Sequence, residues 1–374
     1  MNEAPPQRKV KNRAELRSLL EDSLISPEPD TEAMRFLGEE EDRSLKPKTY
    51  IIESNTDVKT IIENGHQLQA TEDRTLWNIR VDNSQYPFYV YLDTLDERFW
   101  YIHSTNYAPS TDRFVRSFVS GSANHLDHVW LASDDLQILT KGKTPLGFGL
   151  TYADVFAGDE EGSGLSATHY GARIGEVLQG MREITPIKNQ IALSNIRVGY
   201  DSNAGSVKED IYKWGKMIAK KGDSVDAHLN LVESVRDYYS RTIEKVEKEY
   251  VTRFIYSEEH ASVEGSYSVI HFSSDLKNLS RLADLLTSGS RPFRIWGLWR
   301  AVDEEQIKIS GIDQHTNSPL QMELFRNELR VILNEGSCGN VVTRLFSNLQ
   351  SGLDSNCELR GLDNGYIIKP HAVN

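Results

Sequence analysis

Residues 292–353 read PFRIWGLWRAVDEEQIKISGIDQHTNSPLQMELFRNELRVILNEGSCGNVVTRLFSNLQSGL and hold the densest run of strand-like segments in the chain. Apolar and polar residues alternate up to the glycine loop, as in strands with one buried face. From Val341 the apolar residues recur every three or four positions, which indicates an amphipathic helix with Arg344 facing away from the core. We therefore predict a strand meander closed by a helix, with Ser337 or Asn340 as N-cap.

The first strand of this stretch differs from the others. Phe293, Ile295 and Trp299 fall on one face, and Trp296 and Leu298 fall on the other. Apolar residues on both faces are typical of a central strand that is covered on both sides. We expect this strand to lie inside its sheet.

The rest of the chain mixes strand and helix patterns, which predicts an α+β fold with mixed or antiparallel sheets in two or three compact units. Helices are expected at Ala167–Arg182 and over most of Ser206–Val251, which forms a helical middle segment. The predicted division is a charged, flexible N-terminal arm at 1–48, an α/β module at 49–145, a middle segment at 146–255, a second α/β module at 256–368 and a tail at 369–374.

Composition narrows the classes of function. The chain has 374 residues, of which 39% are hydrophobic and 26% charged, as in proteins that bury a sizeable core. A formal net charge of -13 disfavours general electrostatic attraction of the protein surface to nucleic acid or to anionic membranes. Two cysteines indicate a reducing compartment. No apolar run approaches the roughly 18–20 residues that cross a bilayer, so we expect a cytoplasmic protein with no membrane contact.

Well-defined catalytic motifs are absent, and the best catalytic candidates are Asp313, His315 and Glu323. Asp313 and His315 are two residues apart, so they share a face if the strand continues. A hairpin would then bring Glu323 alongside. Such a cluster would hold a divalent metal or form an acid–base pair. The alternative is a solvated polar hairpin end.

A second candidate is the loop before the closing helix. Glycines there leave backbone amides open at a helix N-terminus, where anions bind readily. We expect an anionic small molecule to be held by Ser337, Gly339, Asn340 and Arg344. Alternatively, the glycines only permit a tight turn from strand to helix.

Two hypotheses of different class follow. The first is a non-enzymatic interaction or regulatory protein that has a protein partner and senses an anionic ligand through the glycine loop. The second is a metal-dependent phosphodiester hydrolase that uses the Asp313 cluster. A divalent metal cofactor belongs to the second hypothesis only.

Overall fold

The computed structural model describes residues 8–26, 45–63, 67–82, 87–156, 164–171, 173–185, 187–256, 261–362 and 364–368. These residues form eight helices and two mostly antiparallel sheets, so the predicted α+β class is confirmed. The chain divides into two compact units, and the division passes through strand β9 (Leu193–Ser202) and helix α7 (Val225–Glu249). Unit 1 comprises Met1–His128, Arg197–Ile211 and Gly215–Arg236, and unit 2 comprises Val129–Ile196, Tyr212–Trp214 and Asp237–Asn374.

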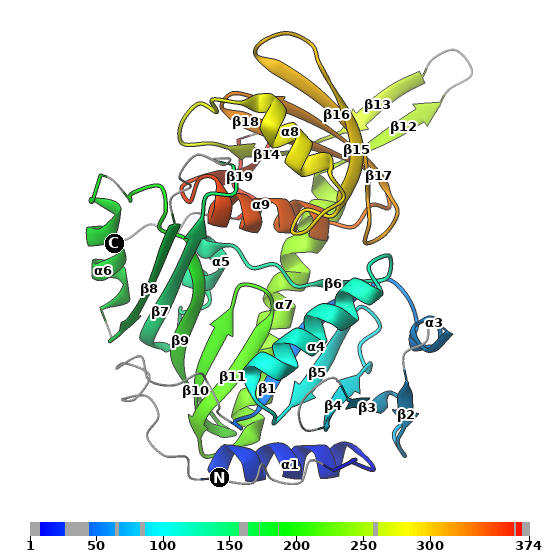
Figure 1. The fold of residues 1–374 in the computed structure, drawn as a ribbon, viewed down its shortest axis with the longest axis vertical. Coiled ribbons are helices and arrows are strands. Elements are labelled where there is room, and N and C mark those ends of the chain that lie inside the picture. The colour runs from blue at the N-terminus through cyan, green and yellow to red at the C-terminus, as the bar shows by residue number, and fades with distance from the viewer. Residues whose placement is uncertain are drawn as a thin grey trace. The chain divides into compact units, whose positions relative to one another are not determined.

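Unit 1 is built on a sheet with the strand order β2-β3-β4-β5-β1-β11-β10-β9, and β6 pairs with the end of β1. Helix α4 lies across the face of this sheet that is toward the viewer in Figure 1. The elements of unit 1 are α1 (Arg13–Ile25), β1 (Lys48–Ser54), α3 (Val58–Glu63), β2 (Leu68–Ala70), β3 (Leu76–Val81), β4 (Phe88–Asp93), β5 (Phe99–Ser104), α4 (Ala108–Gly121), β6 (Leu126–His128), β10 (Gly205–Tyr212) and β11 (Lys216–Gly222).

Helix α1 forms within the predicted N-terminal arm. The Asn12 side chain caps it by accepting the Glu15 N–H at 3.0 Å. At the other end, the Lys46 ammonium donates to the Leu24 and Ser26 carbonyl oxygens at 3.0 and 2.6 Å. Its buried face consists of Leu16, Leu20 and Leu24. Residues 27–44 of the arm lie outside the described residues, and the division of the chain at 48 remains a prediction.

Unit 2 contains a sheet with the order β13-β12-β18-β17-β16-β15, in which β14 joins β18 to β19. Strands β12 and β18 pair in parallel, and the other described strand pairs of this sheet are antiparallel. The elements of unit 2 are α5 (Ser133–Ile138), β7 (Thr144–Ala153), β8 (Gly164–Tyr170), α6 (Ile174–Arg182), β12 (Val251–Tyr256), β13 (Ala261–Gly265), β14 (Ser268–His271), α8 (Leu279–Thr287), β15 (Ile295–Ala301), β16 (Gln306–Asp313), β17 (Pro319–Phe325), β18 (Glu328–Asn334), α9 (Asn340–Gly352) and β19 (Glu358–Gly361).

The predicted meander and its closing helix form as β15–β18 and α9 (Figure 1). One face of the meander packs with α8 and α9 into a single hydrophobic core. Helix α9 is not amphipathic in its setting, because almost every one of its residues is buried. The prediction that Arg344 faces away is wrong: its side chain is 0% exposed. The N-cap is Gly339, which has no side chain to bond the helix end.

Strand β15 is an edge strand, so the prediction of a central strand is wrong. It pairs with β16 on one side and ends the sheet among the described strands. Ile295 faces the core, but Trp296 is 66% and Leu298 is 83% exposed. Strand β15 therefore has apolar residues on both faces, although only one of these faces is buried within this chain.

Two predicted helical regions contain strands instead. Ser206–Val251 begins with β10 and β11, and only its second part is helix α7. The buried, polar Glu209 lies at a core position of β10, beside a bulge, and hides the alternation of the strand. The first part of Ala167–Arg182 is β8, paired with β7, and the helix starts at Ile174. Among the described helices, none is long and apolar enough to span a membrane.

Candidate functional site

Asp313, the first predicted catalytic residue, ends β16 on the core side of the sheet. Arg344, which projects from α9, donates from Nη2 to Asp313 Oδ1. Its Nε donates to the Phe293 carbonyl oxygen at 2.9 Å. Both side chains of the pair are buried. Because an uncompensated buried charge is costly, the structure gives Asp313 the role of internal counter-ion to Arg344.

His315 and Glu323 lie on different faces of the sheet. The His315 N–H donates to Asp313 Oδ1 at 3.3 Å, and its ring is buried. Glu323 stands on the outer face of β17, where its carboxylate lies 3.1 Å from Lys308 Nζ and 3.5 Å from Arg330 Nη1. The structure therefore brings Asp313 and His315 together and leaves Glu323 apart from them.

The predicted anion loop is filled by the chain's own groups. The Gly339 N–H, at the start of α9, donates to Glu247 Oε1 at 2.8 Å. Asn340 Oδ1 accepts from Arg344 Nη1 at 3.3 Å, and Ser337 is buried. A carboxylate bound at a helix N-terminus supplies the negative charge that this end favours. The Glu247 carboxylate thus lies where we expected an anionic ligand.

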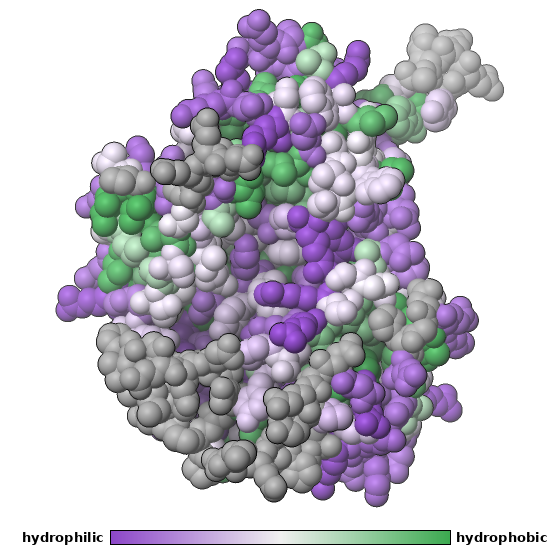
Figure 2. Space-filling model, viewed as in Figure 1, coloured by the Kyte–Doolittle hydropathy of each residue, from purple (hydrophilic) through white to green (hydrophobic). Residues whose placement is uncertain are grey.

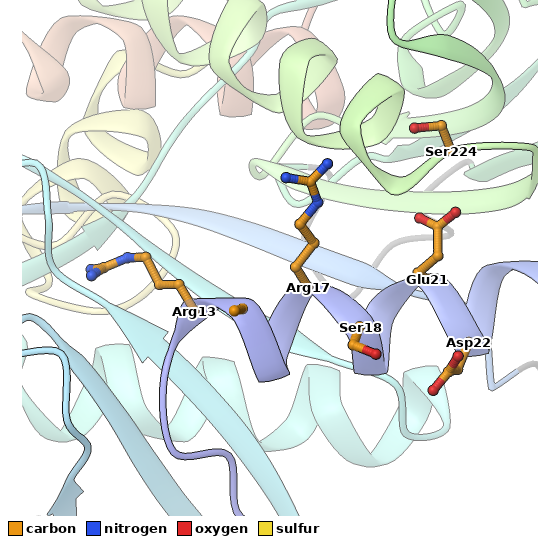
Figure 3. Close-up of a pocket in the computed structure, with 7 residues that line it drawn as sticks. Arg13, Arg17, Ser18, Glu21, Asp22 and Ser224 are labelled. Carbon is orange, nitrogen blue, oxygen red and sulfur yellow. The ribbon is translucent and has the colours of Figure 1, made fainter.

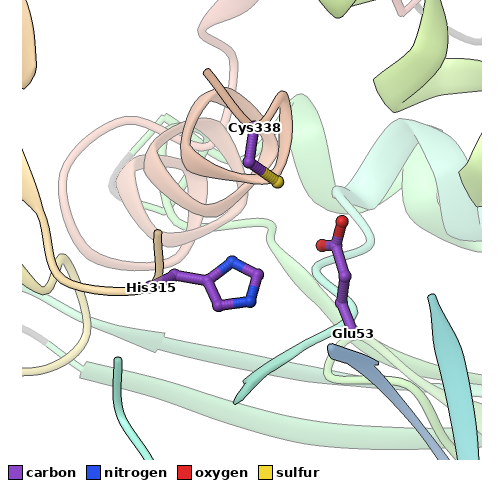
Figure 4. Close-up of side chains that lie close together, drawn as sticks. All are labelled: Glu53, His315 and Cys338. Carbon is purple, nitrogen blue, oxygen red and sulfur yellow. The ribbon is translucent and has the colours of Figure 1, made fainter. Parts of the chain in front are cut away.

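His315 and Cys338 form a second neighbouring pair in unit 2. Figure 4 shows the His315 ring and the Cys338 sulfur turned toward one another. A ring nitrogen and Sγ lie within 4.8 Å, and Cys338 is half-buried. Glu53, also drawn in the figure, belongs to β1 of unit 1, where it accepts from Arg98 Nε at 2.8 Å. Within unit 2 the pair amounts to two ligand atoms, fewer than a structural metal site needs.

A buried polar network ties α7 to three strands of unit 1. The Thr49 hydroxyl lies 2.9 Å from His103 Nδ1 and 2.8 Å from His228 Nε2. His228 Nδ1 lies 2.9 Å from Glu209 Oε2. None of the four side chains is more than 4% exposed. They come from β1, β5, α7 and β10, so no local spacing in the sequence could have revealed them.

The electrostatics of this network follow from its burial. Burial lowers the pKa of His103 to about 4, and the nearby Asp93 counteracts this only in part. Burial also raises the pKa of Glu209, opposed by His228. The hydrogen-bonded series Thr49–His228–Glu209 resembles the nucleophile, base and orienting carboxylate of a catalytic triad. Because all three side chains are buried, a substrate cannot reach the Thr49 hydroxyl. The network fits a structural role in holding α7 on the sheet.

Unit 1 also has an open pocket of about 640 Å³ beside α1 (Figure 3). Two arginines line it, and both are paired: Arg13 with Asp93 at 2.6 Å, and Arg17 with Asp226. Glu21 accepts the Val225 N–H at 2.6 Å. These bonds fasten α1 to its neighbours, so the arginines of this pocket are already neutralised.

The outer face of β15 and β16 is apolar and exposed. Trp296 stands opposite Ile312 in the strand register, and Leu298 follows on the same face. Their exposed fractions are 66%, 49% and 83%. The Trp296 ring lies over Gly289, where an added Cβ would fall 1.7 Å from the indole nitrogen. We call Trp296, Leu298 and Ile312 the outer patch.

The hairpin of β12 and β13 carries further exposed apolar residues. Phe254 and Val263 are cross-strand partners, and Tyr256 lies two residues along the same face. Their exposed fractions range from 59% to 78%. Green, hydrophobic atoms mark this hairpin at the upper right of Figure 2. Because Val251 faces the core beside Leu333, Phe254 and Tyr256 lie on the same face of the sheet as the outer patch.

The fold and these contacts define an α+β protein with internally paired polar candidates and an apolar outer sheet face. The chain belongs to the MJECL33-like protein family, whose model matches residues 4–368. It is similar to a protein of Methanocaldococcus jannaschii described as "Uncharacterized protein MJECL33". The two are 27% identical over 367 residues, which covers 84% of this chain and 87% of the relative. Neither description names an activity.

Proposed function

We propose that this chain is a non-enzymatic interaction protein that docks a protein partner on the outer face of β15 and β16. The observation that carries the proposal is the exposure of Trp296 and Leu298, at 66% and 83%, on a well-formed strand. Single exposed apolar residues are normal, but neighbouring ones that include an aromatic residue mark interaction sites. Burying the outer patch against a partner would remove this apolar surface from water.

The contacts lend less support to the two ligand-based hypotheses. A sensor of anions at the glycine loop would have to displace Glu247 from the Gly339 amide. A metal-dependent hydrolase would need Asp313 without its Arg344 partner, and Glu323 turned to the other face of the sheet. Geometry of this kind favours neither chemistry. The exposed patch needs no rearrangement in order to bind.

A photoreactive side chain at Ser310 tests the proposal. Ser310 is exposed on the outer face and stands opposite Leu298. In cells that natively make the chain, illumination should join this position to a protein partner. Leu298→Arg should abolish the adduct by placing a charge in the interface. The matched control is the same photoreactive group at Glu176 of α6, whose side chain is 73% exposed. Absence of any Leu298-dependent adduct at Ser310 would contradict the proposal.

A further inference from the structure

The free edge of β15 shows which backbone groups are open to a partner. Arg294 C=O accepts from the Gln314 N–H at 3.0 Å, on the β16 side. Ile295 C=O accepts from the Gly289 N–H at 2.8 Å, on the opposite side. Successive residues of a strand direct their backbone groups to alternate sides. Trp299 and Ala301 therefore direct N–H and C=O away from β16, toward the edge.

The start of this edge is already covered, which limits where a further strand can add. Ser288 forms an isolated antiparallel bridge with Trp296. Beyond that bridge, the described residues place no strand against Leu298–Ala301. An edge strand with open backbone groups and an apolar face is a template for another strand.

Charges at the two ends of β15 indicate the direction of the added strand. Arg291 is exposed before the strand, and Asp303 and Glu304 are exposed in the turn after it, where Glu305 is paired with Arg326. If a second β15 runs antiparallel, each acidic turn approaches the basic start of the other copy. A parallel arrangement would instead place like charges together, which is costly. The strand is thus electrostatically complementary to an antiparallel copy of itself.

We propose that a second copy of the chain adds to the edge of this face, by antiparallel pairing of the two β15 strands about Trp299. This inference rests on the proposed function, because the edge that pairs borders the outer patch and brings the two copies of that patch into one docking face. The N–H and C=O groups of Trp299 point away from β16 toward the sheet edge, as the central residue of such a strand pair requires. The interface is isologous, so the same residues serve both copies and the assembly closes as a dimer.

The register of this dimer follows from its centre. Leu298 faces Arg300 of the second copy, and the pairing stops before Trp296, whose edge Ser288 already covers. No like charges stand directly opposite each other, and the aliphatic stem of Arg300 covers Leu298. The outer patches of the two copies then continue across one extended sheet.

Sedimentation equilibrium of the purified full-length chain tests the dimer. We expect a mass of twice 42.5 kDa at high protein concentration. Leu298→Arg should leave a single chain, because it places arginines opposite each other. Adding Arg300→Glu to Leu298→Arg should restore the dimer, since position 298 faces position 300 of the other copy. Circular dichroism of each variant confirms that it remains folded.

Two results would overturn the dimer. One is a wild-type mass of a single chain at every concentration. The other is a dimer that Leu298→Arg leaves intact, or that the second substitution fails to restore. A monomer in solution whose Ser310 photoadduct in cells joins a different protein would end the homodimer while the proposed function stands. Loss of both the dimer and the Leu298-dependent adduct would end both proposals.

Discussion

Helix α9 and strand β15 belong to the same unit, and the exposure of their polar and apolar side chains is opposite. Arg344 of α9 is 0% exposed and Leu298 of β15 is 83% exposed. Around α9 the polar groups are buried and have partners within the chain. On β15 the apolar groups are exposed, and the described chain supplies no cover on that face.

The difference separates stability from recognition. A buried charge with internal partners contributes to a specific fold, and removing one partner is costly. Exposed apolar side chains contribute little to folding, so their presence calls for another explanation. In this protein the charged residues that resemble a catalytic site, such as Asp313 and Arg344, stabilise the fold. The apolar residues that would be expected in a core, such as Leu298, are exposed. The predictions below test that division.

The largest expected effect is that of Arg344→Met. The substitution keeps a long side chain in the core but leaves Asp313 buried and unpaired, since Arg344 Nη2 is its ionic partner. We expect a loss of about 3–5 kcal/mol in the free energy of unfolding, the usual cost of breaking a buried pair. Urea denaturation measures it. Combining Arg344→Met with Asp313→Leu should recover part of the loss. A loss of only about 0.5 kcal/mol in the free energy of unfolding, as is usual for surface substitutions, would show that the Arg344–Asp313 pair is solvated.

The second prediction concerns pH and Asp135 of α5, whose neighbours Ser133 and Asp134 bond Gln350 of α9. Burial raises the pKa of Asp135 from 3.8 to about 7, although it accepts hydrogen bonds from Tyr238 and the Ala132 N–H. A raised pKa means that the folded state holds this proton more tightly than the unfolded state. The resulting stability is complete below pH 3.8 and is lost as pH rises through about 7.

The free energy of unfolding of the wild-type chain should therefore fall across this window relative to Asp135→Asn, which has no proton to lose. At about 1.36 kcal/mol for each pKa unit, the difference amounts to a few kcal/mol. Urea titrations at a series of pH values measure it. Parallel pH profiles for the two proteins would show that Asp135 titrates normally.

The third prediction is a moderate effect of Glu247→Ala. Its carboxylate bonds the Gly339 amide at the start of α9. Loss of such a cap costs about 1–2 kcal/mol. Glu244→Ala on the same helix is the matched control, since the Glu244 side chain is 45% exposed and bonds Lys248 and the Ser240 hydroxyl of its own helix. Thermal denaturation of both variants distinguishes them. Equal effects would remove the capping role.

The smallest effect on stability is expected for Leu298→Ala. Leu320, on the same sheet, is 2% exposed and supplies the matched core site. Leu320→Ala should cost about 2–5 kcal/mol, whereas Leu298→Ala should stay within about 0.5 kcal/mol of the wild type. The comparison must be made at a protein concentration low enough to avoid association. A large loss at Leu298 would mean that the chain itself covers the outer patch.

Much of the fold was predictable from periodicity, and the failures have physical causes. The meander and α9 follow from strong local patterns around Leu320 and Val341. Strand β10 was missed because Glu209, a buried partner of His228, interrupts its apolar face. The buried position of Arg344 was hidden because its partner Asp313 is distant in the sequence. Local spacing cannot report pairing between distant segments.

The candidate site shows the same limit. Asp313 and His315 are close in sequence, and the structure places them together. Glu323 was assigned to the cluster from a hairpin argument that did not determine which face it occupies. The exposure of Trp296 and Leu298 was not predictable, because apolar residues on both faces also describe a central strand. Only the strand order distinguishes a covered face from an open one.

Hydrogen–deuterium exchange of the β15 amides tests the central claim most directly, namely that the chain leaves this edge and face uncovered. The amides of Trp299 and Ala301 should exchange fast in dilute protein, while those of the central strand β18 stay protected. Fast exchange at β15, slowed only when a partner or a second copy is present, is the predicted result. Protection of β15 equal to that of β18 in the dilute monomer would contradict it.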